Sequence, residues 1–241
     1  MRGMDELNFL IHNIKKYRNI VIQRRLRSKK NMVYHAFIDN KPVVLKWYTP
    51  GRSKQMKIEQ NILKNGSSSL HIPVLLDKDT DNNVLIMSYI PGRNLCDVIN
   101  NNNISLREKK RILILLANWF AVFHDYFKTP KRLYVRGDSI LNNFIINTHV
   151  WGVDFEEFRK GNPMEDIADM CSSILSTNPM FTYEKFQLCK TFITSYPGSA
   201  EWDSKDVDKE IANMLIDRIQ WRPWDEKILI KYANRIRKEG L

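Results

Sequence analysis

The sequence has few of the features that mark secreted, disulfide-bonded or membrane-spanning proteins. It contains three cysteines, an odd number, and no pair has the spacing of a zinc or redox site. We therefore expect reduced thiols, packed in the core of a cytoplasmic protein. The first residues contain no apolar signal segment. The most apolar stretch, residues 112–123, is too short to span a bilayer, so we expect no membrane span.

Charge is unevenly distributed along an otherwise ordinary globular composition. The chain is 43% hydrophobic and 27% charged, with a net charge of +11. Residues 1–60 hold 14 Lys or Arg against 4 Asp or Glu, whereas residues 61–241 hold 24 against 23. A basic field of this kind suits a polyanion, such as nucleotide phosphates, nucleic acid or an anionic membrane. A solvated basic surface without a ligand is the alternative.

The first third of the chain has the pattern of a β-rich unit. A short leading helix is predicted at 8–19 and a second helix at 52–64, where Asn65-Gly66 ends it. The turn residues Asp39-Asn-Lys-Pro42 separate two apolar runs. Five strands are predicted, at 20–22, 32–38, 43–48, 74–77 and 84–89.

From residue 90 the apolar spacing becomes helical. Ser105, with Glu108 three residues later, predicts a capping box at the start of a long helix. Helices are predicted at 94–101, 105–127, 163–177, 181–195, 205–220 and 224–238. The fold class is therefore α+β and bilobal. Residues 1–89 form an N-lobe with a five-stranded antiparallel sheet and one main helix, and residues 90–241 form a mostly helical C-lobe.

Four groups of chemically competent residues occur in a fixed order along this layout. Lys46 ends an apolar strand, and Glu59 lies in the middle of the following helix. A carboxylate at that place can hold the lysine ammonium for binding phosphates. Then come Arg136-Gly-Asp138-Ser-Ile-Leu-Asn-Asn143 and Gly152-Val-Asp154-Phe. Oxygen donors such as Asn143 and Asp154 suit Mg²⁺.

This order resembles the protein-kinase superfamily, in which a catalytic Asp precedes a metal-binding Asn by five residues. The resemblance implies a protein-kinase-like fold, with Asp138 as the catalytic base. It also implies that Asn143 and Asp154 bind Mg²⁺, or Mn²⁺ in its place. Lys46 and Glu59 would then serve the phosphates of ATP.

The segment Met87-Ser88-Tyr89-Ile90 resembles the hinge of atypical kinases, whose backbone meets the adenine edge. No Ala-Pro-Glu motif follows Asp154. Instead, Gly161-Asn-Pro-Met-Glu-Asp166-Ile-Ala resembles a segment of aminoglycoside phosphotransferases, in which Asp166 would be structural. The compact length also resembles Rio kinases, lipopolysaccharide core kinases and the small kinase of the tRNA threonylcarbamoyladenosine complex.

Three positions depart from the kinase pattern. The loop Arg24–Asn31 contains no glycine, although kinases place a glycine-rich loop over the phosphates. Its backbone amides and cations can bind phosphate, or the loop can be a mobile basic surface. Arg136 replaces the usual His, which is mainly structural in kinases. Glu156 replaces the Gly after Asp-Phe, where it can bind a second ion or face solvent, and we expect Glu157 to face solvent.

We predict an ATP-dependent phosphotransferase that moves the γ-phosphate to a hydroxyl of a small molecule or of a protein Ser or Thr. One alternative is a non-catalytic ATP-binding pseudokinase scaffold. Another is an RNA- or ribosome-associated kinase-like protein, with RNA contact through the basic N-terminal region. Trp221 and Trp224, with Arg235-Ile-Arg-Lys238, could assist that contact. Core or lobe packing is the favoured interpretation of both tryptophans.

Overall fold

The computed structural model describes residues 18–66 and 68–241. The described chain forms two compact units, one made of residues 18–66 and 72–90 and the other of 68–71 and 91–241. The predicted α+β class, with a five-stranded antiparallel sheet followed by a mostly helical chain, is confirmed. The leading helix predicted at 8–19 falls almost entirely outside the described residues.

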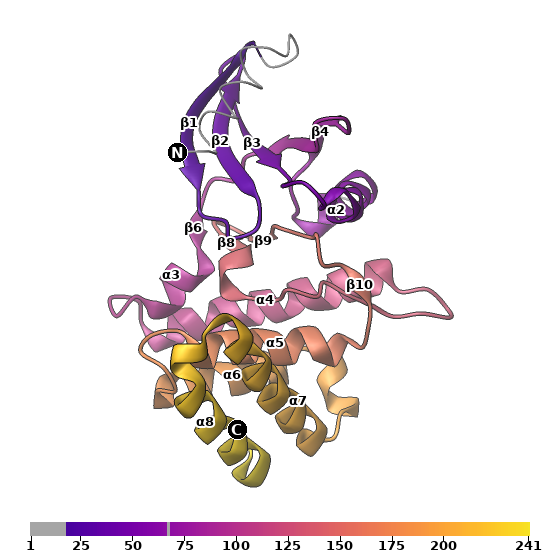
Figure 1. The fold of residues 1–241 in the computed structure, drawn as a ribbon. Coiled ribbons are helices and arrows are strands. Elements are labelled where there is room, and N and C mark those ends of the chain that lie inside the picture. Colours follow the sequence, from indigo (N-terminus) through magenta and orange to yellow (C-terminus); the bar gives the residue numbers. More distant parts are fainter. Residues whose placement is uncertain (1–17, 67) are drawn as a thin grey trace. The chain divides into compact units, whose positions relative to one another are not determined.

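The first unit is built on one antiparallel sheet of order β1-β2-β3-β5-β4 (Figure 1). Asp39 and Asn40, which join the second and third strands, both have positive φ, as tight hairpin turns require. The strands are β1 (Ile20–Leu26), β2 (Met32–Ile38), β3 (Lys41–Trp47), β4 (Leu75–Asp79) and β5 (Val84–Ser88).

β1 is longer than the apolar pattern predicted. It continues to Leu26 and pairs with β2 through an irregularity between Ile22 and Arg24. β1 lies at the edge of the sheet, where charged side chains such as Arg24 and Arg25 remain in water. The second half of β1 therefore lacks the apolar pattern by which a strand is recognised from the sequence.

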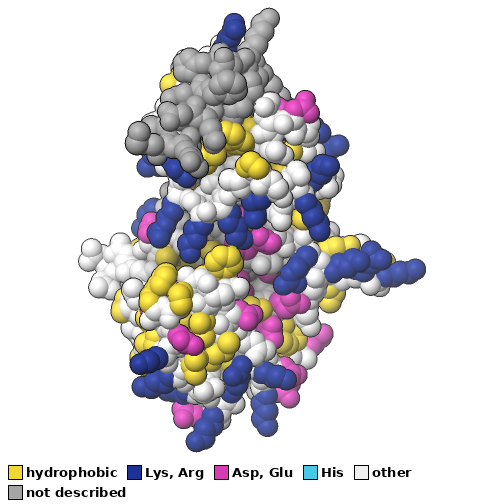
Figure 2. Space-filling model, viewed as in Figure 1, with side chains coloured by type: hydrophobic (Ala, Val, Ile, Leu, Met, Phe, Trp, Pro, Cys, Tyr) yellow, Lys and Arg dark blue, Asp and Glu magenta, His cyan; other side chains and the backbone are white. Residues whose placement is uncertain are grey.

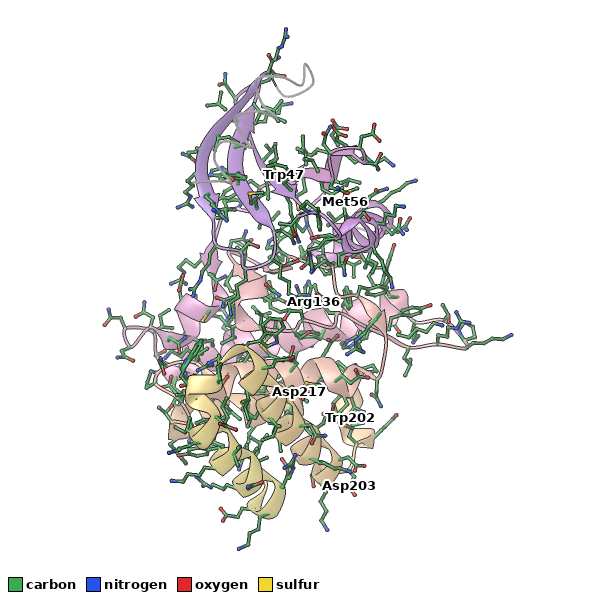
Figure 3. All side chains as sticks on the ribbon, in the orientation of Figure 1. Trp47, Met56, Arg136, Trp202, Asp203 and Asp217 are labelled. Atoms are coloured by element: carbon green, nitrogen blue, oxygen red, sulfur yellow. The ribbon has the colours of Figure 1, made fainter. Side chains whose placement is uncertain are left out.

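Alternation along β3 decides which side chains enter the core. Val43 and Leu45 point into a buried apolar cluster with residues of β1, β2 and β5, whereas Lys46 points to the other face. The main helix of the unit, α2 (Ser53–Asn65), buries Met56, labelled in Figure 3, together with Glu59. A buried lysine and a buried glutamate are thus supplied by neighbouring elements.

A short piece between α2 and β4 belongs to the second unit rather than to the first. It contains the 3-10 helix η2 (Ser68–Leu70) and His71. The indole Nε1 of Trp119 donates to the Leu70 carbonyl at 2.6 Å, and the Gly152 N–H donates to the His71 carbonyl at 3.1 Å. These bonds give the segment its partners in the helical unit.

The second unit is mainly helical, with three short strand pairings. Ser105 caps α4, its hydroxyl accepting the Glu108 N–H at 3.2 Å, which is one half of the predicted capping box. Its α-helices are α3 (Leu95–Asn100), α4 (Leu106–Phe127), α5 (Pro163–Ser176), α6 (Tyr183–Ser195), α7 (Ser204–Asp217) and α8 (Glu226–Glu239). Its short strands are β6 (Arg93–Asn94), β7 (Tyr134–Val135), β8 (Phe144–Ile146), β9 (Val150–Gly152) and β10 (Arg159–Lys160).

α5 is the central helix of this unit. Asn162 and Glu165 form a complete capping box at its start, and Pro163 occupies the first turn, where a missing N–H has no cost. Nearly all residues from Asp166 to Ser176 are buried. A helix surrounded by packing on this scale is a rigid support for neighbouring loops.

The end of α5 is held by a lysine from α6, and this contact gives a pH-dependent prediction. Lys185 is 3% exposed, and its Nζ donates to the Thr177 hydroxyl at 2.6 Å and to the Thr177 carbonyl. Burial lowers the pKa of Lys185 to about 8. The unfolded chain, with an ordinary lysine pKa, therefore holds more protons than the folded chain above pH ~8.

Stability should consequently rise between about pH 8 and pH 10.5, as the buried ammonium loses its proton. Relative to Lys185→Met, the wild-type free energy of unfolding should increase by roughly 1–2 kcal/mol between about pH 7.5 and 9.5. Urea unfolding across this range measures it. Lys190→Met, on the exposed side of the same helix, is the control and should run parallel to wild type. Parallel curves for Lys185→Met would contradict the prediction.

Among the residues that the structure describes, no helix is both long enough and apolar enough to cross a membrane.

Candidate functional site

The first unit brings Lys46 and Glu59 together. Lys46 Nζ lies 2.6 Å from Glu59 Oε2, and the two side chains are 5% and 1% exposed. The Tyr48 hydroxyl donates to the same Glu59 oxygen, and its ring lies 5.0 Å from Lys46 Nζ. Tyr48 directly follows the last residue of β3 and is two positions beyond Lys46, and both side chains contact Glu59. The ammonium is therefore fixed by a buried carboxylate and a ring face.

The predicted hinge follows β5 and ends the first unit. Met87 and Ile90 are buried, whereas Ser88 and Tyr89 are partly exposed. The Ser88 N–H donates to the Val74 carbonyl at 2.9 Å, so this amide is already used within the sheet. The Tyr89 ring stacks on His35 with centroids 3.9 Å apart. The hinge thus has a fixed backbone on one side and an aromatic stack on the other.

In the second unit, Asp138 and Asn143 form a closed turn. Asn143 Nδ2 donates to the Asp138 carbonyl at 3.0 Å and to its carboxylate Oδ2 at 3.2 Å. With its amide nitrogen engaged in this way, Asn143 has its Oδ1 directed away from Asp138. Gly137 makes the turn possible, because its φ is +84° and a Cβ there would lie 2.3 Å from the Glu157 carbonyl.

A hairpin connects Asn143 to Asp154. β8 and β9 pair in the register Phe144 to Gly152, and the next bond runs from the Val153 N–H to the Asn143 carbonyl at 3.0 Å. Asn143 and Asp154 therefore leave the same end of one hairpin. Asp154 has a φ of +66°, a left-handed conformation that is uncommon outside glycine and concentrated at functional sites.

Arg136, labelled in Figure 3, joins these two loops through hydrogen bonds to their carbonyl groups. It is fully buried, and its Nη1 donates to the Asp138 carbonyl at 2.8 Å. Its Nη2 donates to the Asp154 carbonyl at 2.8 Å and to the Val153 carbonyl. The guanidinium also lies 5.1 Å from the centre of the Phe155 ring. Arg136 thus holds the backbone on both sides of the site, which is a structural task.

One face of α5 is the template for the loop of residues 136–141, the predicted catalytic loop. Asp166 accepts the N–H groups of Arg136 and Gly137 at 2.6 and 3.0 Å. Asp169 Oδ2 accepts the Ser139 N–H at 2.8 Å, and Ser173 accepts the Leu141 N–H at 3.0 Å. These three acceptors follow at helical spacing and bond alternate stretches of the loop. The helix therefore sets the loop conformation residue by residue.

Asp166 and Asp169 differ in their protonation chemistry. Burial alone would raise the pKa of Asp166, but the hydrogen bond and charge of His124 and the two backbone N–H groups hold that pKa below its ordinary value. The pKa of Asp169 is raised, first by burial and further by the charge of Asp138, against the opposing charge of Arg218. Asp166 is a structural anchor, in agreement with the resemblance.

The two glutamates after Asp154-Phe155 behave differently. Glu156 is 3% exposed, so the solvent-facing alternative for this residue is wrong. One of its carboxylate oxygens lies within 4.8 Å of one on Asp154. Glu157 is only partly exposed. The carboxylates of Asp154, the residue with the left-handed conformation, and of Glu156 thus lie close together. Such an arrangement is able to hold a hard cation.

Trp221 and Trp224 do not pack in the core, so the core part of the favoured interpretation was wrong. They are 57% and 77% exposed, on the 3-10 turns η5 (Arg218–Trp221) and η6 (Pro223–Asp225). The sequence predicted a regular helix through residue 220, but α7 ends at Asp217. Two arginines hold this tighter segment, with Arg218 bound to Asp169 and Arg222 to Asp225 and the Ser176 carbonyl.

Two shallow surface hollows of the second unit involve none of the predicted site residues. The hollow on the outer face of α4 has a volume of about 490 Å³. The other, about 560 Å³, lies between the start of α7 and the end of α8, where Lys and Arg side chains gather in Figure 2. Its basic residues are Lys205, Lys209, Arg237 and Lys238.

Sequence reasoning missed three residues that hold predicted site residues or their loop, namely Tyr48, Asp169 and Arg218. A local signal existed for the first two. Tyr48 is two residues beyond Lys46, so the strand period places both on one face. Asp169 is three residues beyond Asp166, so the helical period places both on one face. Nothing local indicates Arg218, whose contact with Asp169 spans 49 residues.

The chain has the fold of aminoglycoside phosphotransferases. The crystal structure of aminoglycoside phosphotransferase APH(4)-Ia aligns with a TM-score of 0.68 over 99% of both chains, at 14% identity. The ternary complex of APH(2″)-IIa with streptomycin and ATP aligns with a TM-score of 0.62 over 96% of both chains, at 14% identity. A thermostable mutant of APH(4)-Ia, in a ternary complex with ADP and hygromycin B, aligns with a TM-score of 0.59. It covers 95% of this chain and 97% of its own at 14% identity.

The predicted protein-kinase-like fold is thereby confirmed. No protein-family model and no curated protein sequence matches the chain. At 14% identity the structural similarity establishes the fold, and the activity has to be argued from the residues of this chain.

Proposed function

We propose that this protein is an ATP-dependent phosphotransferase that moves the γ-phosphate to a hydroxyl group of a small molecule. The observation that carries the proposal is the turn in which Asn143 binds the carboxylate of Asp138, with both loops fixed by Arg136. Similar structures of the same fold contain ATP or ADP together with a small antibiotic, which supports a nucleotide donor and a small acceptor.

Lys46 is proposed to bind the phosphates of ATP. Its buried pairing with Glu59 at 2.6 Å fixes the position of the ammonium before ATP arrives. The backbone of Met87, Ser88, Tyr89 and Ile90 is proposed to meet the adenine. The N–H of Ser88 is occupied by Val74, so the carbonyl of Ser88 and the groups of its neighbours would serve this contact.

A divalent metal fits the donor set of the second unit. Asn143 offers an amide oxygen, because its nitrogen is held by Asp138, and Asp154 and Glu156 offer carboxylate oxygens. These are the hard oxygen donors that Mg²⁺ prefers, and Mn²⁺ accepts the same set. When bound, the ion neutralises the negative charge that develops on the phosphates.

Asp138 is proposed to orient the acceptor and take its proton. The hydroxyl oxygen forms a bond to the γ-phosphorus while the bond from phosphorus to the β,γ-bridging oxygen breaks, so the products are a phosphate ester and ADP. The hydroxyl proton goes to Asp138 Oδ1, because Oδ2 already accepts from Asn143. Holding this carboxylate in one position removes the entropy of its search for the hydroxyl.

A small acceptor is favoured over an extended peptide. The segment between Asp154 and the start of α5 at Pro163 is short, and it is fixed by the pairing of β10 with β7, in the register Arg159 to Val135. It therefore offers little platform for a protein Ser or Thr. Trp221 and Trp224 are exposed on the segment that Arg218 anchors beside the catalytic loop, and they offer flat surfaces to a ring-bearing acceptor.

Removing the lysine should weaken ATP use. For Lys46→Met we expect the KM for ATP to rise roughly 10- to 100-fold, the loss of a charge-assisted contact. Steady-state kinetics with varied ATP measure it. Lys57→Met, on the exposed side of α2, is the matched control and should leave the KM unchanged. An unchanged KM for Lys46→Met would remove Lys46 from the proposed site.

The alternative of a non-catalytic scaffold predicts ATP-dependent thermal stabilisation without transfer to any acceptor. A panel of amino sugars, polyols and an unfolded Ser- and Thr-rich protein, assayed for ADP formation with Mg²⁺, separates the two functions. Transfer to a panel member that is lost in Asp138→Asn excludes the scaffold. RNA contact has no support in the fold or in the similar structures, and it stays a prediction, as does a cytoplasmic location.

A further inference from the structure

Arg218 joins the C-terminal segment to the catalytic loop through one carboxylate. Its Nη2 lies 2.7 Å from Asp169 Oδ1, and the other oxygen of the same carboxylate accepts the Ser139 N–H at 2.8 Å. We propose that Arg218 is a positioning residue for Asp138, acting through Asp169. This inference rests on the proposed phosphotransferase function and assigns a role in it to a residue outside the kinase-like motifs of the sequence.

The peptide group between Asp138 and Ser139 is held from two sides. Its carbonyl accepts from Arg136 Nη1 at 2.8 Å and from Asn143 Nδ2 at 3.0 Å. Its N–H donates to Asp169 at 2.8 Å. Rotation of this peptide would swing the Asp138 side chain, so the catalytic carboxylate keeps its direction only while both sides are held.

Asp169 needs a cation to do this. Its side chain is 20% exposed, and the charges of Asp138 and Asp166 both oppose its ionisation. Burial raises the pKa of Asp169, and the positive charge of Arg218 opposes that rise. An ionised carboxylate is a much stronger acceptor for the Ser139 N–H than a protonated one. Arg218 therefore preserves the bond that fixes the peptide.

Arg218 is itself fixed. Its Nε donates to the Ser172 hydroxyl at 2.7 Å, and its Nη2 donates to the Asp169 carbonyl at 3.0 Å. The side chain is 17% exposed. Arg218 makes three hydrogen bonds to one turn of α5, so its side chain is held more firmly than that of a single surface ion pair.

Arg222 is a matched control on the same segment. Its side chain is 23% exposed, and it binds Asp225, the Ser176 carbonyl and Met180. In the described part of the chain, none of these partners is hydrogen-bonded to the catalytic loop. Replacing Arg222 should therefore loosen the segment without changing the support of Asp138.

The test compares Arg218→Gln, Arg218→Lys and Arg222→Gln. Both glutamine variants should lower the melting temperature by a similar amount. Arg218→Gln should lower kcat about 10- to 100-fold, as expected for a displaced catalytic group, with the ATP dissociation constant unchanged. Arg218→Lys should fall between it and wild type, and Arg222→Gln should keep kcat within about threefold. Equal loss of kcat in Arg218→Gln and Arg222→Gln would overturn the inference.

The pH dependence adds a readout that a merely structural role would not move. Three charged groups act on Asp169: Arg218 from the end of α7, Asp138 from the catalytic loop and Asp166 from α5. Without Arg218, Asp169 should need a higher pH to ionise. The ratio of kcat for Arg218→Gln to kcat for Arg222→Gln should therefore rise with pH, and a flat ratio counts against the inference.

Amide hydrogen exchange at Ser139 keeps this test separate from the proposed function. Arg218→Gln should speed exchange of the Ser139 N–H at least about tenfold relative to Arg222→Gln, because its acceptor is weakened. Faster exchange with no transfer by wild type would mean that the proposed function is wrong but that Arg218 does support the Ser139 bond through Asp169. Unchanged exchange in both variants would overturn the inference whatever the activity.

Discussion

Replacing Asp154 with Asn should abolish metal-dependent phosphate transfer, lowering kcat by roughly a thousandfold or more. A carboxylate oxygen of Asp154 lies within 4.8 Å of one on Glu156, and Asp154 has a left-handed conformation that Arg136 holds through the Asp154 carbonyl. Asn tolerates the same conformation, so the backbone should be preserved while one charged metal ligand is lost. Turnover at saturating ATP, with Mg²⁺ varied, measures the effect.

The matched control is Asp206→Asn, an exposed carboxylate in the first turn of α7. It should leave kcat and the Mg²⁺ dependence unchanged. A variant at Asp154 that keeps full activity at ordinary Mg²⁺ concentration would place the metal site elsewhere. Partial recovery at high Mg²⁺ or Mn²⁺ would agree with a weakened ligand.

Replacing Asp138 with Asn should lower kcat by about a hundredfold to ten-thousandfold, the usual contribution of a general base. The isosteric amide can still receive the hydrogen bond from Asn143, which is 3.2 Å from the carboxylate in the wild type. The dissociation constant for ATP should therefore stay within about twofold. Single-turnover kinetics and a binding titration together separate the two quantities.

Loss of ATP binding in Asp138→Asn would instead indicate a disturbed fold. Full transfer by this variant would show that another group takes the proton. This second result would remove Asp138 from the role of base and would leave the phosphotransferase activity itself intact.

The local pattern predicted the elements well because each is encoded by neighbouring residues. The caps at Ser105 and Asn162 and the turn at Asp39 fixed where helices and strands begin and end. The order of one strand and the next helix also predicted that Glu59 can hold the Lys46 ammonium, and the structure places the two together. The caps and the turn depend on residues within a few positions of one another, and the Lys46–Glu59 pair on two consecutive elements.

The supporting network could not be predicted in the same way. Arg136 was recognised only as a replacement, yet it joins its own loop to the carbonyls of Val153 and Asp154, which lie 17 and 18 positions away. The bond from Arg218 to Asp169 spans 49 positions, and no period relates them. Exposure of Trp221 and Trp224 was also unpredictable, because an apolar side chain gives no sign of whether a partner covers it.

Fold and sequence have separated widely in this chain. A shared architecture at 14% identity needs only that volumes, apolar periods and turns be conserved in kind, not in residue. The loop that carries Asp138 is held through hydrogen bonds between its backbone and side chains of α5 and of Arg136, rather than by apolar packing. Such bonds tolerate changes in the surrounding core, so the loop geometry can persist while the core sequence changes.

The most direct test of the central claim is a phosphorus NMR time course of ATP with Mg²⁺, the purified protein and a panel of small hydroxyl compounds. With wild type, the γ-phosphate signal should decline while signals of ADP and of a new phosphate monoester grow, and with Asp138→Asn this change should be slowed about a hundredfold or more. An intact γ-phosphate signal with every acceptor, or equal rates for wild type and Asp138→Asn, would contradict the account.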